Sequence, residues 1–90
     1  MKSYLIIYQI SGSESNYTSL IAYLKTAPQW ARPIPGVWVV KTTSTAALLR
    51  DGVKSRIGPN DKVLVTLMPN SDWGTSNISK EVTDWMKNNL

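Results

Sequence analysis

The chain has 90 residues, of which 42% are hydrophobic and 18% are charged, and its formal net charge is +4. This composition is typical of one small globular domain over residues 1–90, and it excludes an intrinsically disordered chain. The sequence contains no cysteine and no histidine, which excludes disulfides, thiol nucleophiles, the common zinc sites and triads with an imidazole base.

A strand and a helix are expected at the start of the chain. Residues 4–10 are apolar on both faces of an alternating pattern, which is typical of an interior strand in a sheet that is covered on two sides. A polar loop follows, and Ser15 or Asn16 is expected to cap a helix that ends before Pro28. The apolar residues of this helix recur at helical spacing: Tyr17, Leu20, Ile21 and Leu24.

The middle of the chain carries the strongest strand pattern. Most residues of 37–43 are β-branched or aromatic and both faces are apolar, so we expect a central strand. Residues 29–34 are expected to form an edge strand, because Pro33 and Pro35 have no N–H to donate to a ladder. Pro35 and Gly36 predict the turn between the two strands.

Three further elements complete the chain. Ser44 is expected to cap a second helix that ends near Gly58, and its apolar stripe consists of Ala46, Leu49, Val53 and Ile57. Residues 62–68 predict a strand, and a terminal helix is expected to begin near Ser79. The segment 69–77 between them is the longest irregular piece. The terminal helix presents four apolar residues along one side: Val82, Trp85, Met86 and Leu90.

The order strand, helix, strand, strand, helix, strand, helix predicts an α+β fold. Its first six elements match the βαββαβ pattern of ferredoxin-like folds, and the seventh is an additional C-terminal helix. In that topology an antiparallel sheet centres the first and third strands and carries two helices on one face. We expect the terminal helix, or a second copy of the protein, to cover the face that we assign to Tyr4, Ile6, Tyr8, Trp38 and Val40.

Aromatic residues on the two central strands suggest a nucleic-acid surface. Tyr8 and Trp38 occupy positions where RNA-binding sheets of this topology place stacking side chains, with Arg32 and Lys41 available for phosphates. The alternative is that both rings belong to the core under the terminal helix or to a dimer interface. The positive net charge is compatible with a polyanion, but the basic residues form no run and fit a solubilising surface as well.

Residues for catalysis are scarce in this sequence. None of the six carboxylates falls in an expected strand, and no pair has a spacing that suits acid/base or metal chemistry. We expect surface roles for them, with Asp61 as a turn residue ahead of its strand. Glycine-rich phosphate motifs and an activated serine are also absent.

The opening of the chain indicates the compartment. Met1 leads directly into an apolar segment of about seven residues, which is too short for a secretory signal or a membrane span. We therefore expect a cytoplasmic protein without a membrane partner.

A family resemblance is carried by these segments: Tyr4-Leu5-Ile6-Ile7-Tyr8, Asn16-Tyr17-Thr18, Trp30, Val37-Trp38-Val39-Val40-Lys41, Trp73 and Asp84-Trp85-Met86-Lys87-Asn88-Asn89-Leu90. With them the chain resembles small bacterial proteins labelled SinR-like, over nearly its whole length. Its βαββαβ part is similar to the CRISPR-associated endonuclease-like ferredoxin-fold family, the smaller partner of the spacer-integrating complex. The resemblance implies a ferredoxin-like fold and a symmetric homodimer.

In that wider superfamily an aspartate usually ends the first strand and is the proposed metal ligand of members with nuclease activity. Gln9 stands at the matching position, and its neutral amide is a poor ligand for Mg²⁺. We therefore expect a non-catalytic homodimeric binding or structural module without a cofactor. Two alternatives stay open: a Mg²⁺-dependent nuclease for RNA or DNA, and a single-stranded RNA-binding sheet protein. The candidate nucleic-acid or dimer surface consists of Tyr8, Gln9, Arg32, Trp38 and Lys41.

Overall fold

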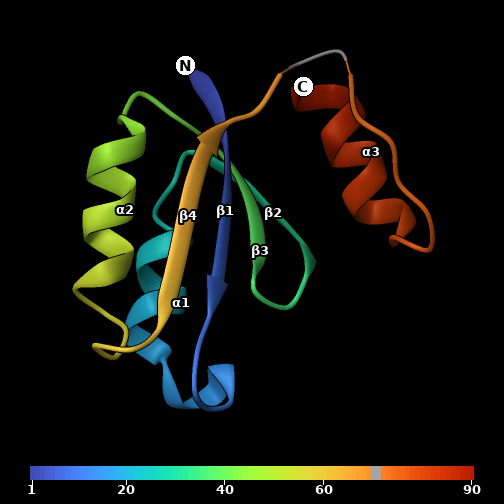
Figure 1. Cartoon of the computed structure of the whole chain (residues 1–90). Coiled ribbons are helices and arrows are strands. Elements are labelled where there is room, and N and C mark those ends of the chain that lie inside the picture. The colour runs from blue at the N-terminus through green and yellow to red at the C-terminus, as the bar shows by residue number, and fades with distance from the viewer. Residues whose placement is uncertain (70–71) are drawn as a thin grey trace.

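The secondary structure follows the order that the sequence predicts (Figure 1). The computed structural model describes residues 1–69 and 72–90. The strands are β1 (Lys2–Gln9), β2 (Gln29–Ile34), β3 (Val37–Thr42) and β4 (Lys62–Leu67). The helices are α1 (Thr18–Leu24), α2 (Ala46–Lys54) and α3 (Lys80–Asn89), and a 3₁₀ turn, η1 (Glu14–Asn16), precedes α1. The predicted irregular segment 69–77 includes Asn70 and Ser71, which lie outside the described residues.

The four strands form one antiparallel sheet in the order β2-β3-β1-β4. β1 pairs on one side with β3, from Lys2 opposite Thr42 to Ile7 opposite Val37. On its other side it pairs with β4, where Ile7 lies opposite Leu64. The prediction that the first and third strands are central is confirmed, and so is the edge position of β2. A tight turn joins β2 to β3 at Gly36, whose φ of 83° favours glycine.

The helices α1 and α2 pack on one face of the sheet, which we call the inner face. It carries Trp38 and Val40 of β3 and, on β1, Tyr4, Ile6 and Tyr8. The predicted stripes of both helices, from Tyr17 to Leu24 and from Ala46 to Ile57, belong to this core. We had placed the terminal helix or a second copy over these residues, and that assignment is wrong. Both faces of β1 and β3 are apolar, so their alternation could not tell which face receives α1 and α2.

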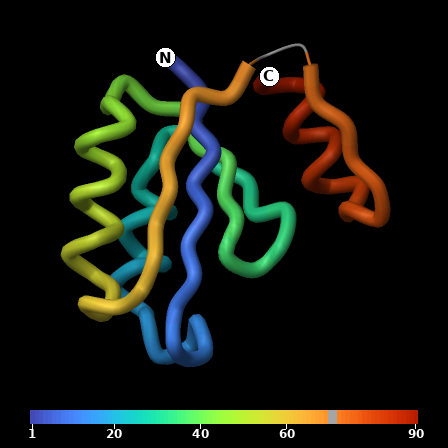
Figure 2. The backbone as a smooth tube through the Cα atoms, in the orientation of Figure 1, coloured from blue at the N-terminus to red at the C-terminus, as the bar shows by residue number. Residues whose placement is uncertain are grey.

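The terminal helix α3 lies on the other side of the sheet from α1 and α2, as Figures 1 and 2 show. We call this the outer face. α3 packs against β2, and its residues Val82 and Trp85 line a hollow together with Trp30 and Ala31. Met86 of the same helix is buried. The helix therefore covers the β2 end of the outer face and leaves the end near β4 open.

Two of the predicted helix starts differ from the structure. Thr45, one residue after the expected Ser44, caps α2 by accepting a hydrogen bond from the Leu48 amide. The first helix begins at Thr18 after η1, and the described structure gives it no side-chain cap. Ser79 caps α3 as predicted. Short polar residues are frequent in this chain, so propensity alone does not select among neighbouring caps.

Gly52 lies inside α2, where the ring of Tyr23 from α1 packs against it. A Cβ at this position would lie 2.1 Å from the Tyr23 hydroxyl oxygen and 2.2 Å from Cζ. The guanidinium of Arg56 lies 4.2 Å from the centroid of the same ring, which holds the ring in place. The glycine is thus required by packing between the two helices, although it weakens the helix itself.

Replacing Gly52 by alanine is expected to lower the free energy of unfolding by about 1–3 kcal/mol, because the Tyr23 ring must leave its position. Urea denaturation followed by circular dichroism measures this change. In a Tyr23→Ala background the same substitution is expected to stabilise the protein by up to about 1 kcal/mol, the helix preference of alanine over glycine. Equal stabilisation in both backgrounds would contradict the packing described.

Candidate functional site

The two aromatic rings of the predicted stacking surface are inside the protein. Tyr8 is 6% exposed and Trp38 is 0% exposed, and both lie in the core under α1 and α2. A base cannot stack on a ring that two helices cover. Tyr8 and Trp38 are therefore core residues in this structure, and α1 and α2 cover them in place of the terminal helix or second copy that we expected.

Tyr8 and Trp38 belong to a hydrogen-bond network at one end of the sheet. The Trp38 Nε1–H donates to the Tyr8 hydroxyl oxygen at 3.0 Å, and the Tyr8 hydroxyl donates to Glu14 Oε2 at 3.1 Å. The Gly36 amide donates to Glu14 Oε1 at 3.0 Å, and the Arg32 guanidinium pairs with Oε2. Glu14 therefore accepts the hydrogen bond of the Tyr8 hydroxyl, and that hydroxyl in turn accepts the Trp38 N–H, so the polar tips of both core aromatics are satisfied.

The five residues of the predicted surface do not form one site. Arg32 is bound within the network, paired with Glu14 and 5.3 Å from the centroid of the Trp38 ring. Gln9 and Lys41 lie on the outer face, opposite Lys62 and Ser3 respectively, and so at opposite ends of β1. The structure thus brings Tyr8, Arg32 and Trp38 together and separates Gln9 and Lys41 from them.

Asp61 and Asp84 have partners within the protein. Asp61 accepts hydrogen bonds from the Gly58 amide, the Ser11 amide and the Tyr17 hydroxyl, so it ties the α2–β4 loop to the connection between β1 and α1. This confirms its predicted turn role. On α3 the hydrogen bond from Lys80 to Asp84 raises the pKa of Lys80 above its ordinary value.

Glu14 is the carboxylate that we misassigned to the surface. It sits in a polar stretch, and its partners come from β1 and the β2–β3 hairpin.

Among residues 1–69 and 72–90, no three acidic, cysteine or histidine side chains gather as they would around a metal ion.

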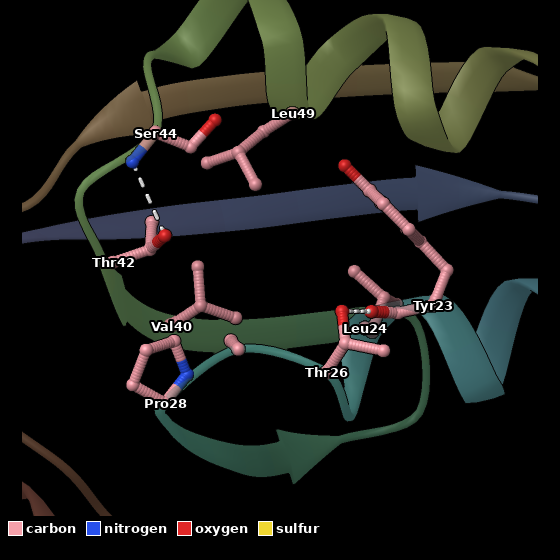
Figure 3. Close-up of a pocket in the computed structure, with 9 residues that line it drawn as sticks. Tyr23, Leu24, Thr26, Pro28, Val40, Thr42, Ser44 and Leu49 are labelled. Carbon is pink, nitrogen blue, oxygen red and sulfur yellow. Dashed lines mark hydrogen bonds between the residues drawn. The ribbon is translucent and has the colours of Figure 1, made fainter.

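The hollows on the inner side range from about 170 to about 460 Å³. A cavity of about 170 Å³ lies between α1, α2 and β3. Figure 3 shows the side chains of Tyr23, Thr26, Thr42 and Ser44 around it. Two of these groups already bond to the protein, since the Ser44 amide donates to Thr42 Oγ1 and Thr26 Oγ1 donates to the Tyr23 carbonyl. This cavity therefore lies between the C-terminal end of α1 and the start of α2, and part of its polar lining is bonded to the protein itself.

The outer face carries an exposed apolar row across the whole sheet. It consists of Ile34, Val37, Ile7 and Leu64, which are neighbours in register from β2 to β4. Ile7 is 39% exposed, Ile34 is 49% exposed and Leu64 is 55% exposed. Such a contiguous uncovered surface is typical of a protein contact site. The alternation of β1 and β3 contained this signal, but we assigned that face to the first two helices.

The comparisons with known proteins add no relative. No family model, curated protein or solved structure matches this chain. In the part of the chain that the structure describes, none of the helices has the length and apolar character needed to cross a membrane.

Proposed function

We propose that this protein is a non-catalytic, homodimeric binding or structural module with a ferredoxin-like fold. The strand order β2-β3-β1-β4, with α1 and α2 on the same face, supports the ferredoxin-like assignment. The connection to SinR-like and CRISPR-associated endonuclease-like proteins stays a prediction from the sequence. It agrees with this proposal in fold type and in the expected dimer.

A single observation carries the proposal of self-association: the sheet exposes large apolar side chains beside its β4 edge. Leu64 and Leu67 on β4 are 55% and 56% exposed, and Ile7 lies next to Leu64 on β1. Full burial of one such side chain stabilises a protein by roughly 1.5–3 kcal/mol, so covering three that are half exposed gives a substantial gain. A second copy of the chain brings an identical apolar surface to this contact.

The test is the mass of the protein in solution. Sedimentation equilibrium is expected to give twice the 10.0 kDa mass of one chain. Replacing Leu64 and Leu67 together by threonine is expected to raise the dissociation constant of the dimer at least tenfold, because about 1.4 kcal/mol of apolar contact is enough for that change. Threonine keeps the β preference of the strand, so the fold is retained.

The matched control is Ile34→Thr. Ile34 is an exposed apolar residue of the outer face, like Leu64, but it lies on β2 at the opposite edge of the sheet. This substitution is expected to leave the dissociation constant unchanged. A wild-type protein that stays monomeric up to its solubility limit would refute the homodimer.

A further inference from the structure

The two edges of the sheet differ in how they are protected against pairing with another strand. β2 contains Pro33, its register with β3 is irregular between Ala31 and Ile34, and α3 packs against it. These are the usual devices that prevent edge-to-edge association. β4 has no proline, pairs with β1 through six consecutive residues, and carries its single charge, Lys62, at its first position. One edge is therefore blocked and the other is open.

The backbone groups at the open edge can be identified. The Met68 amide donates to the Ser3 carbonyl at 2.9 Å, so the even-numbered residues of this strand point toward β1. In an antiparallel ladder the direction alternates, and the N–H and C=O groups of Val63, Val65 and Leu67 point away from the sheet. None of the turn, loop and cap hydrogen bonds among the described residues involves these three.

We propose that β4 pairs antiparallel with β4 of a second copy, with Val65 opposite Val65 on the two-fold axis, to form one continuous sheet of eight strands. This inference rests on the homodimer proposed above and names the strand that forms it. The register also places Val63 opposite Leu67 of the second copy, and Leu67 opposite its Val63. All three outward-facing residues then exchange both backbone bonds, giving about six hydrogen bonds in total.

The side chains fit a second copy in this register. Leu67 meets Val63 of the other chain on the inner face, and Leu64 meets its Thr66 on the outer face. The two most exposed apolar residues of the sheet are thereby covered. Each Lys62 is three residues from the axis, so the two lysines lie about 20 Å apart at about 3.4 Å per residue. That distance exceeds the Debye length of about 8 Å, and their repulsion is screened.

A proline scan along β4 tests the pairing. Val65→Pro removes an N–H that points away from β1, and proline is tolerated on edge strands at such positions. The variant is expected to keep the circular dichroism of the wild type and to dissociate at least tenfold more readily in sedimentation equilibrium. Its matched control, Thr66→Pro, removes a donor to β1 and is expected to lose the folded spectrum.

Cysteine cross-linking tests the register without weakening the strand. In the proposed dimer the two Val65 Cα atoms are about 5.5 Å apart, inside the range that a disulfide spans. The chain has no other cysteine, so oxidised Val65→Cys is expected to run as a covalent dimer on a non-reducing gel. Leu64→Cys is the control, because its two copies are two residues out of register and farther apart than the limit of about 7 Å.

The outcomes separate this inference from the proposed function. A monomeric wild type overturns both. The edge pairing alone would be overturned if the wild type is a dimer and three results are found together: Val65→Pro leaves the dimer intact, Val65→Cys does not cross-link it, and Ile34→Thr weakens it. The two copies would then meet through their outer faces. Cross-linking of Val65→Cys without cross-linking of Leu64→Cys supports the pairing even if the proline variant fails to fold.

Discussion

Replacing Trp38 by alanine is expected to lower the free energy of unfolding by about 3–5 kcal/mol, the cost of removing a large aromatic side chain from a core. Trp38 is completely buried on the central strand β3, and its ring packs against Trp30 at a centroid distance of 5.3 Å. The substitution also leaves the Tyr8 hydroxyl without its donor. Since small domains are stable by only about 5–15 kcal/mol, most of the margin is lost.

Urea denaturation followed by far-ultraviolet circular dichroism measures this effect, because that signal does not depend on the deleted indole. Trp30→Ala is the matched control, since Trp30 is an exposed tryptophan on the neighbouring strand. Its loss is expected to lower stability by less than half as much. An unfolding midpoint for Trp38→Ala equal to that of the wild type would show that the ring is not in the core. Any loss of nucleic-acid binding by this variant would reflect unfolding.

Replacing Glu14 by alanine is expected to lower the free energy of unfolding by about 2–4 kcal/mol. The substitution removes the acceptor for the Gly36 amide and the Tyr8 hydroxyl and leaves the Arg32 guanidinium without its carboxylate. Each partly buried donor that loses its partner costs about 1–3 kcal/mol, less where water replaces the carboxylate. Glu14→Gln keeps an acceptor oxygen but removes the charge, so a smaller loss is expected.

Two comparisons test whether the loss of stability in Glu14→Ala comes from the hydrogen bonds and the ion pair of Glu14. Glu81→Ala removes an exposed glutamate from α3 and is expected to change stability by no more than about 0.5 kcal/mol. In a double-mutant cycle, Glu14→Ala and Arg32→Ala are expected to be non-additive by about 0.5–3 kcal/mol. Additive effects of the two substitutions would mean that the ion pair contributes nothing to stability.

The sequence was sufficient for the order of the elements and for most of their bounds. Strand β3 was predicted to within one residue, because its β-branched and aromatic residues form an uninterrupted local pattern. The end of the first helix before Pro28 and the turn at Pro35-Gly36 could also be predicted from the sequence, because both depend on the backbone geometry of these residues themselves. The apolar stripes of α1 and α2 were read correctly from their helical spacing.

The candidate site was predicted poorly, and Glu14 explains part of the failure. Its partners are 6 to 22 residues away in the sequence, at Tyr8, Arg32 and Gly36. Neither the composition of the chain nor the spacing of its residues indicates that a residue of a polar loop lies beside the turn of a hairpin. The same holds for Asp61, whose bond to the Ser11 amide spans 50 residues.

Periodicity and turn chemistry therefore determined which segments of this protein are helices and strands, because both act between residues that are close along the chain. Only the tertiary structure decided which face of the sheet lies under α1 and α2. The central strands are apolar on both faces, so their residues do not distinguish the two faces. The handedness of the connections between strands and helices selects the face that the helices cover. The tertiary structure also decided that α3 protects the β2 edge and leaves β4 open. The edge position of β2 could be predicted from its own Pro33, whereas β4 contains no proline and its own residues do not show that it lacks a second neighbour.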